Sequence, residues 1–416
     1  MQKSALQAFH EGLAYSENRK FDKAIAAFTE AIRLDPEYTT AHHLRGIAYS
    51  TIGELDKAIA DFTEAIRLDS EYADAYFNRG FASGSKCDHD KAIADYNEAI
   101  RLAPKFAVAY RYRGIAYESK GELDKAIADY NEAICLAPTF AAAYRNRGFA
   151  YERKGELDKA IADYTEAIRL DPKFAAAYRN RGFASGSKGD HDKEIADYTE
   201  AIHLDPNHAA VYYNRGVTYV SKGDFDRAIA DYTEAIRLDL KYAAAYYNRG
   251  VAYREMGEPD KAIADFTETI RLGPKDAVAY FNRGTAYRRK GEFDKAIADY
   301  TEATRLNPKF AAAYFNRGNA YSKMGELDKA IADYTEAIRL DPKVPDACFA
   351  YSFRGSIYRE MGELDKAIAD FSEAIRLDPK DATAYYNRGV TYEKMGDQAK
   401  ARKDFAQATK LGLQTP

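Results

Sequence analysis

Residues 243–276 read AAAYYNRGVAYREMGEPDKAIADFTETIRLGPKD, and this stretch decides the fold. Each half places small and aromatic residues at the spacing of one helical face, which predicts two helices. Gly257 separates the halves, and Pro274 ends the second one. Pro259 suits the first turn of a helix, because the N–H that proline lacks would have no partner there. We expect an antiparallel pair of helices, A and B, and number the positions of this unit 1–34 from Ala243.

The unit recurs along almost the whole chain. Glycine at position 8 returns every 34 residues, except that the step from Gly318 to Gly355 is 37 residues. A fixed period of this size predicts an array of stacked repeats and leaves no segment for a separate catalytic domain. We expect ten repeats in 5–344, a short insertion at 345–347 that bends the array, and two further repeats in 348–415. The last repeat has Arg402 and Thr409 where isoleucine is the rule, which predicts a polar cap.

The charges of the chain nearly balance, since 61 basic and 65 acidic residues give a net charge of -4. No global field would therefore draw it to nucleic acid or to an anionic membrane. The three cysteines have no spacing typical of a metal site, and no apolar run predicts a signal peptide or a membrane span. These features predict a cytoplasmic protein without a metal or other cofactor.

The repeated positions form one pattern: an aromatic residue at 4, Gly at 8, Tyr at 11, Ala at 20, Phe or Tyr at 24, Ala at 27 and Pro at 32. This pattern resembles the tetratricopeptide repeat, and the resemblance covers essentially the whole chain. It implies an all-α fold, a right-handed α-solenoid superhelix of antiparallel helix pairs, with a concave groove lined mainly by A helices. One departure is systematic, because position 7, usually leucine in the family, is arginine in eleven of twelve repeats.

The position-7 arginines have a matching acid, because position 23 is aspartate in eleven repeats. The first repeat lacks both residues and carries Glu11 and Ala27 instead. Arg45 has Asp61 in its own repeat, whereas position 23 of the preceding repeat is alanine. This favours an ion pair within each repeat. The alternative is a basic stripe that binds an anionic ligand.

Positions 2, 5, 6, 9, 12 and 13 line the groove if the chain has the family's geometry. Asparagine offers one acceptor and two donors, which suits an extended peptide backbone. It occupies position 6 without interruption in six repeats: Asn146, Asn180, Asn214, Asn248, Asn282 and Asn316. Position 5 changes from basic to aromatic along the chain: Arg111, Arg145, Arg179, Tyr213, Tyr247, Phe281 and Phe315. A peptide with an acidic part and an apolar part would suit this change. Recent duplication explains the asparagine row equally well, and ordinary surface variation explains position 5.

Two repeats are irregular, since both carry FASGSK at 81–86 and 183–188 and histidine at position 17. Tyrosine at position 11 becomes serine, and helix A gains a second glycine, which predicts altered packing and local weakness. Ser185, His191 and Glu194 suggest a catalytic set. The run of Cys87, Asp88, His89 and Asp90 suggests a metal site. Neither has a supporting motif, so we expect no catalytic residues and no metal ligands.

The sequence therefore predicts a non-catalytic protein–protein interaction scaffold, or adaptor, that binds an extended peptide or partner protein in its groove. The family's carboxylate clamp for chaperone tails is disfavoured, because only Asn319 provides its asparagine at position 9. The alternatives are a structural role through self-association and a targeting arm of a separate enzyme. We expect neither nucleic acid nor membrane as a partner, and the partner protein itself is not identified by the sequence.

Overall fold

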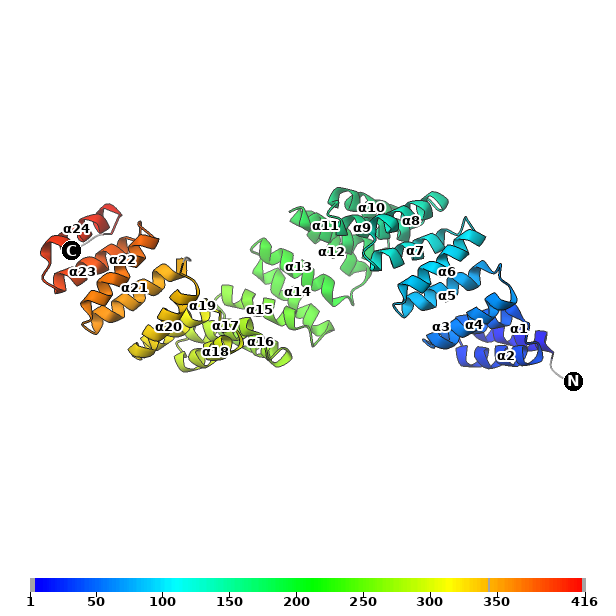
Figure 1. Ribbon diagram of the computed structural model, residues 1–416, viewed down its shortest axis with the longest axis horizontal. Helices are drawn as coiled ribbons and strands as arrows, with labels where there is room; N and C mark the ends of the chain where they lie inside the picture. The colour runs from blue at the N-terminus through cyan, green and yellow to red at the C-terminus, as the bar shows by residue number, and fades with distance from the viewer. Residues whose placement is uncertain (1–3, 343–344, 414–416) are drawn as a thin grey trace. The chain divides into compact units, whose positions relative to one another are not determined.

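The computed structural model describes residues 4–342 and 345–413, which form 24 helices and no strand. The helices come in consecutive A and B pairs, one pair for each 34-residue repeat (Figure 1). The all-α fold and the helix pairs that the sequence predicts are confirmed. The chain separates into two compact units, Met1–Pro206 and Asn207–Pro416, which are described one at a time.

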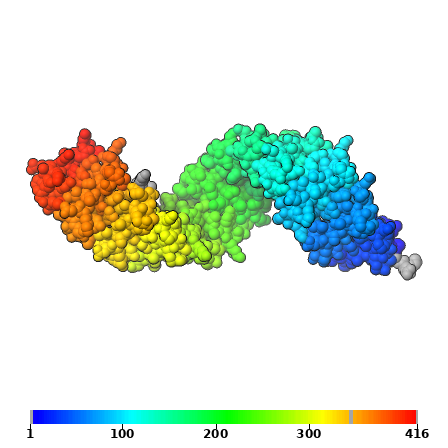
Figure 2. All heavy atoms as spheres, viewed as in Figure 1, coloured from blue at the N-terminus to red at the C-terminus, as the bar shows by residue number. Residues whose placement is uncertain are grey.

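The first unit holds six helix pairs. Each A helix packs on its own B helix, each B helix packs on the next A helix, and successive A helices from the second repeat onward also touch. Chain order is therefore stacking order within the unit, as the colour progression in Figure 2 shows. Its helices are α1 (Ala5–Glu17), α2 (Phe21–Leu34), α3 (Thr39–Thr51), α4 (Leu55–Leu68), α5 (Ala73–Ser85), α6 (His89–Leu102), α7 (Ala107–Ser119), α8 (Leu123–Leu136), α9 (Ala141–Arg153), α10 (Leu157–Leu170), α11 (Ala175–Ser187) and α12 (His191–Leu204).

The second unit repeats the same arrangement with six further pairs. Pro259 is the first residue of α16, as the sequence predicts. The helices of this unit are α13 (Ala209–Ser221), α14 (Phe225–Leu238), α15 (Ala243–Glu255), α16 (Pro259–Leu272), α17 (Ala277–Arg289), α18 (Phe293–Leu306), α19 (Ala311–Lys323), α20 (Leu327–Leu340), α21 (Pro345–Glu360), α22 (Leu364–Leu377), α23 (Ala382–Lys394) and α24 (Gln398–Lys410).

The glycine at position 8 allows helices A and B to pack closely. A Cβ atom added at Gly114 would lie 2.6 Å from the ring of Tyr130, and Tyr130 is fully buried. Ala126, at position 20, is also fully buried. The cost of a helical glycine, about 1 kcal/mol against alanine, is thus offset by the packing of a large aromatic ring against bare backbone.

The turn between helices A and B needs a left-handed residue at position 15. Glycine fills this position in most repeats, with φ of +76° at Gly257, for example. Arg19 and Cys87 adopt the same conformation with φ of 55° and 63°. Cys87 is thus a turn residue on the surface, and Asp88 after it caps α6 by accepting a hydrogen bond from the backbone N–H of Lys91. This accounts for the cysteine and aspartate that suggested a metal site.

The position-7 arginines form the ion pair predicted within each repeat. The Nε and Nη2 atoms of Arg249 donate to the two carboxylate oxygens of Asp265 over 2.8 and 2.7 Å. The Arg249 side chain is 16% exposed and the Asp265 side chain 6%. The hydrogen bond to Asp265 is the main factor that raises the pKa of Arg249. A basic stripe open to ligands is therefore not what position 7 provides.

The third nitrogen of the same arginine reaches the preceding repeat, which the sequence did not indicate. Nη1 of Arg249 donates to the hydroxyl of Thr233 on α14 over 2.9 Å. Nη1 of Arg113 likewise donates to the Asn97 side-chain oxygen on α6 over 2.7 Å. Within each unit, these arginines join helix A of one repeat to helix B of the same repeat and to helix B of the repeat before. We call this set of contacts the arginine joint.

The inserted residues extend a helix. Residues 345–347 begin α21, which runs from Pro345 to Glu360 and is three residues longer than the other A helices of this unit. Residues 343 and 344, where the expected bend would begin, lie outside the described residues, as do the last residues of the twelfth repeat. The side chains of Arg402 and Thr409 on α24 are exposed, as expected for a polar cap.

Candidate functional site

The surface formed by positions 2, 5, 6, 9, 12 and 13 of the A helices, here called the A-helix face, carries exposed apolar residues. Eight of the fifteen exposed large hydrophobic residues in the described chain lie at its positions 2, 6 and 9. They are Leu6, Phe81, Val108, Phe183, Val217, Val278, Phe349 and Phe353. Exposed aromatic and aliphatic side chains that recur on one face favour a protein-binding surface. The repeat pattern predicts that these positions line the groove, whereas their apolar character was not predicted.

The three position-5 arginines of the first unit lie half-buried on this face. The guanidinium carbon of Arg111 lies 5.0 Å from the centre of the Tyr112 ring and 5.6 Å from that of Phe140. That of Arg145 lies 5.7 Å from the Phe149 ring centre. Burial and the neighbouring charge of Arg145 lower the pKa of Arg179. An anion beside these arginines would be favoured, because it would offset their mutual repulsion.

Two acidic residues at position 12 lie close to the arginines. Glu118 accepts a hydrogen bond from the hydroxyl of Tyr130 over 2.9 Å, and Glu152 accepts one from Tyr164 over 2.8 Å. Burial raises the pKa of both carboxyl groups, although Arg145 counteracts it. These carboxylates are half-buried acceptors for the helix B tyrosines. Part of the positive charge on this face is thus balanced within the unit.

The asparagines of the first unit contact the arginines of the preceding repeat. Asn146 and Asn180 are 4% and 8% exposed. The amide of Asn146 is oriented so that its nitrogen and its oxygen both have hydrogen-bond partners. The nitrogen donates to the Ala142 carbonyl over 3.2 Å, and the oxygen accepts from Nε of Arg111 over 3.2 Å. The oxygen of Asn180 accepts from Nε of Arg145 over 3.3 Å in the same way. These two asparagines therefore support the arginines from below the surface.

The position-5 aromatic residues of the second unit are also half-buried. Their rings pack on the aromatic residue at position 24 of helix B, with centroids 5.8 Å apart for Tyr213 and Tyr232 and for Phe281 and Tyr300. Tyr247 packs in the same way on its own helix B, and Phe315 does so too and also stacks on Phe353. These rings close the core of each repeat and offer one edge to the A-helix face.

The asparagines of the second unit bond to the position-5 residue of the repeat before. Asn248 donates to the hydroxyl of Tyr213 over 2.9 Å, and Asn282 donates to that of Tyr247 over 3.0 Å. Asn282 also donates to the Val278 carbonyl, and its oxygen accepts from Arg254, so the 5% exposed amide is fully engaged.

The other two asparagines of the second unit are half-buried. Asn316 donates to the Ala312 carbonyl over 2.9 Å, and Asn214 lies at the corresponding position of α13. Five of the six asparagines are thus hydrogen-bonded within the protein, and four of them pair with the position-5 residue that lies 35 residues earlier.

The irregular repeat of α11 and α12 does not hold a catalytic relay. His191 Nδ1 lies 3.0 Å from Glu194 Oε2, so this pair is formed. The Ser185 hydroxyl is buried and makes no hydrogen bond to any described residue, so the histidine does not activate it. Within residues 4–342 and 345–413, no three acidic, histidine or cysteine side chains lie where they could hold a metal ion. In the same part of the chain, no helix has the length and apolarity needed to span a bilayer.

Family comparisons match the chain nearly from end to end. A model described as TPR repeat matches 117–155, 186–223, 284–325 and 355–396. Models described as tetratricopeptide repeat match 9–73, 73–106, 141–174, 213–277, 266–298, 311–344 and 382–412. The chain is a tetratricopeptide repeat protein. As such it is a protein-interaction scaffold, since solenoids of this kind present extended binding surfaces.

Three solved structures similar to this tetratricopeptide repeat protein are shorter chains. YrrB, described as a TPR protein with an unusual peptide-binding site, is 26% identical over 45% of this chain and 96% of its own, with a TM-score of 0.42. MamA protein is 31% identical over 41% and 94%, with a TM-score of 0.39. The C-terminal part of a TPR repeat-containing protein from Cytophaga hutchinsonii is 20% identical over 58% and 98%, and its TM-score of 0.51 supports the shared fold. A comparison with curated proteins gave no match.

Proposed function

We propose that this tetratricopeptide repeat protein is a non-catalytic scaffold that holds an extended peptide of a partner protein on its A-helix face. The observation that carries the proposal is the recurrence of exposed apolar side chains at positions 2, 6 and 9, such as Phe183 and Phe349, which are 50% and 51% exposed. A peptide laid across successive A helices would cover these side chains. Burial of apolar area contributes about 25 cal/mol per Å², so several such contacts support binding.

The asparagine and position-5 residues have a second role in this proposal. Asn146, Asn180 and Asn282 are buried and bonded within the protein, so they hold the arginine and tyrosine side chains in place for a ligand. Hydrogen bonds to a peptide contribute about 1 kcal/mol each. Ordering the peptide costs about 1–2 kcal/mol per residue. The exposed apolar residues must therefore supply most of the affinity, and the arginines the preference for an acidic segment.

A photo-crosslinking experiment tests the proposal. The amino acid p-benzoylphenylalanine replaces Phe183 on α11 or Phe349 on α21, one site in each unit. The controls carry it at Lys125 on α8 or Lys329 on α20, whose side chains are 64% and 61% exposed on B helices. We expect a lysate of the source cell to give a crosslinked partner from the first two variants and not from the controls. A synthetic peptide from the crosslinked segment should then bind the wild-type chain.

Other results would contradict the proposal. Capture at Lys125 or Lys329 alone would place binding on the B helices. Crosslinks between two copies of the purified chain, formed at Phe183 or Phe349 without any lysate, would instead support the self-assembly role.

Replacing the acidic residues of a bound peptide by their amides should weaken binding to the first unit, because Arg111, Arg145 and Arg179 would lose their counter-charges.

A further inference from the structure

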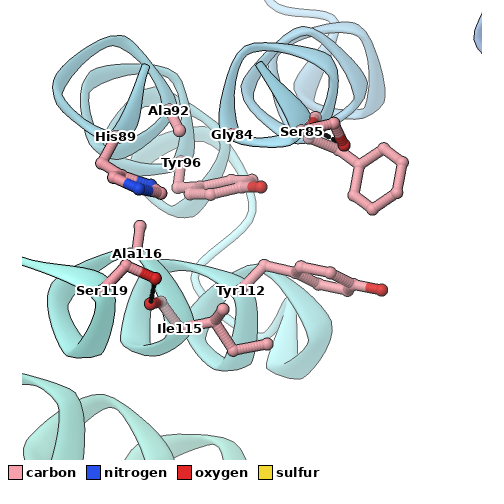
Figure 3. Close-up of a pocket in the computed structure, with 10 residues that line it drawn as sticks. Gly84, Ser85, His89, Ala92, Tyr96, Tyr112, Ile115, Ala116 and Ser119 are labelled. Carbon is pink, nitrogen blue, oxygen red and sulfur yellow. Dashed lines mark hydrogen bonds between the residues drawn. The ribbon is translucent and has the colours of Figure 1, made fainter. Parts of the chain in front are cut away.

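A cavity of about 220 Å³ lies in the third repeat, between the pair α5 and α6 on one side and α7 on the other (Figure 3). Its walls include the methyl groups of Ala92, Ile115 and Ala116. The imidazole of His89 and the ring of Tyr96 point into it from α6. Pockets for drug-sized ligands are about 300–1,000 Å³, so this cavity suits a smaller group.

The cavity exists because Gly84 occupies position 12. A Cβ atom built at Gly84 would meet only the Cβ of Ala92 at 3.5 Å and the hydroxyl oxygen of Tyr96 at 3.9 Å. The next two repeats have Glu118 and Glu152 at this position, and each carboxylate accepts a hydrogen bond from the helix B tyrosine of its own repeat. The third repeat has the tyrosine and lacks the carboxylate.

The sixth repeat shows how the same site looks when a carboxylate fills it. It shares the FASGSK segment, with Gly186 at position 12 and His191 at position 17, and has Glu194 where the third repeat has Ala92. A Cβ atom built at Gly186 would overlap the carboxylate of Glu194, so this carboxylate occupies the space that is open beside Gly84. Its Oε2 lies 3.0 Å from Nδ1 of His191.

The charge of this carboxylate affects the pKa of the neighbouring tyrosine. Burial and then the negative charge of Glu194 raise the pKa of Tyr198. Tyr96, its counterpart in the third repeat, is 2% exposed, and burial raises its pKa, so the hydroxyl stays protonated and can donate. Among the described residues, no acceptor lies within hydrogen-bonding distance of that hydroxyl. Three successive repeats thus place a carboxylate against a buried tyrosine, and the third repeat offers the same surroundings without it.

We infer that the cavity of the third repeat binds a carboxylate on a short aliphatic chain, the group that Glu194 supplies in the sixth repeat. His89 and the Tyr96 hydroxyl would take the carboxylate oxygens, and the methyl groups of Ala92, Ile115 and Ala116 would contact the aliphatic carbons. A carboxylate enters such a site only when hydrogen-bond donors replace its water, and these two side chains can donate to it. The hydroxyls of Ser85 and Ser119, which also line the cavity, already donate to backbone carbonyls of their own helices. The inference stands apart from the proposed peptide function. The group could belong to a free acid or to a glutamate side chain of a partner.

The test measures binding of the probe n-butyrate to the full chain by ligand-detected NMR titration. We expect the wild-type chain to bind one equivalent. Ala92→Glu should abolish binding, because it introduces the residue that fills the sixth repeat. Glu194→Ala should add a second equivalent by opening the equivalent space beside Gly186. Tyr96→Phe and His89→Leu, which introduce residues found at these positions in other repeats, should each weaken binding by about tenfold or more through loss of a hydrogen bond to a charged group.

Two results would overturn the inference. Equal binding of butyrate by the wild type and by Ala92→Glu would place the probe elsewhere. Equal binding of n-butanol and n-butyrate would show an apolar hole without preference for a carboxylate. The peptide N-acetyl-Ala-Glu-Ala-amide distinguishes the two sources of the carboxylate. If this peptide displaces butyrate and its glutamine version does not, the site is assigned to a glutamate side chain of a partner. Binding of butyrate without displacement by the peptide assigns it to a free acid.

Discussion

The arginine joint is the feature of single residues with the greatest energetic consequence. The carboxylate of Asp265 is buried, and its two oxygens are taken by one guanidinium group. The pair is worth most as a matched set, because removal of one partner leaves the other charge buried and uncompensated. In this protein the same set recurs in all repeats except the first, so the energetics of one joint can be studied against many identical neighbours.

Arg249→Ala is expected to destabilise α15 and α16 by about 3–5 kcal/mol, because Asp265 stays buried without its partner. Arrays of repeats do not unfold in one step, so native-state amide exchange of these helices is the measurement. The control is Arg271→Ala, which breaks an exposed pair with Glu268 (61% and 40% exposed) and should cost less than about 1 kcal/mol. Equal protection in the two variants would contradict the structural role, and so would lost ligand binding with unchanged protection in Arg249→Ala.

The carboxyl group of Glu118 makes the stability of its repeat depend on pH. Burial raises its pKa above the usual 4.5, so the folded chain holds this proton more tightly than the unfolded chain does. The contribution of the Glu118 carboxyl group to stability is full below pH 4.5 and falls as the pH rises through the folded-state pKa. Glu118→Gln should therefore gain stability over the wild type as the pH is raised from about 4 to 7. Urea unfolding monitored at α7 and α8 measures this.

Glu122 provides a control of opposite sign. The hydrogen bond from Lys125 lowers its pKa, so its contribution is present above 4.5 and is lost as the pH falls. Glu122→Gln should lose stability against the wild type over the same rise in pH. If both glutamine variants changed in the same direction, burial of Glu118 would not be the cause.

Single residues were predictable from the sequence where one repeat differed from the others. The joint absence of arginine and aspartate from the first repeat predicted the ion pair, which is confirmed in Arg45 and Asp61. The contact of Arg45 with Thr29 in the preceding repeat was not predicted, although the sequence holds a signal for it: position 25 is threonine, asparagine or serine in eleven repeats and alanine, Ala406, in the last. The bond between Tyr213 and Asn248 was missed for another reason: a spacing of 35 residues has meaning only once the repeats are stacked.

At the scale of helices, α5 and α11 are the two that carry an additional glycine, at 84 and 186. Gly84→Ala should stabilise α5 by about 1 kcal/mol, since alanine is the better helix former and its Cβ has room beside Ala92. Gly186→Ala should gain less or lose stability, because its Cβ would displace the carboxylate of Glu194. Amide exchange in α5 and α11 compares the two. Equal gains would show that Glu194 does not occupy the space beside Gly186.

The helices themselves were predictable because each repeat restates the same signals. Gly257 and Pro259 predicted the break between α15 and α16, and the structure places it there. The inserted residues 345–347 form the first turn of α21, and the separation of two groups of repeats expected there stays a prediction. Proline is compatible with a first turn as well as with a loop, so the sequence allowed either outcome.

At the scale of the whole chain, we expect the last repeat to prevent further stacking. Arg402 and Thr409 occupy positions where Ile236 and other isoleucines of the inner repeats are buried against the next helix. Changing both residues to isoleucine should expose an apolar face on α24 and promote self-association. Light scattering over a range of concentrations measures the mass. The expected result is a mass that rises with concentration more steeply than for the wild type. An unchanged mass would show that these two side chains do not control association at this end.

The candidate site was less predictable than the fold. The A-helix face follows from the repeat pattern, and its exposed residues such as Phe183 could be read from the sequence by position. The burial of Asn146 and Asn282 could not, because it depends on how closely consecutive A helices approach each other. Which partner binds depends on the partner's own sequence as well as on the A-helix face.

The arginine joint has one consequence for the history of the chain. Nη1 of Arg354 reaches the Thr335 hydroxyl over 2.7 Å although 19 residues separate them, whereas 16 residues separate Arg317 from Thr301. The joint therefore tolerates three additional residues between the arginine and its acceptor, which lengthen α21. The junctions within each unit also use the same donor and a similar small acceptor. Duplication or loss of a whole 34-residue block would thus recreate the same contact at the new junction, and the number of copies can drift while each junction keeps one chemistry.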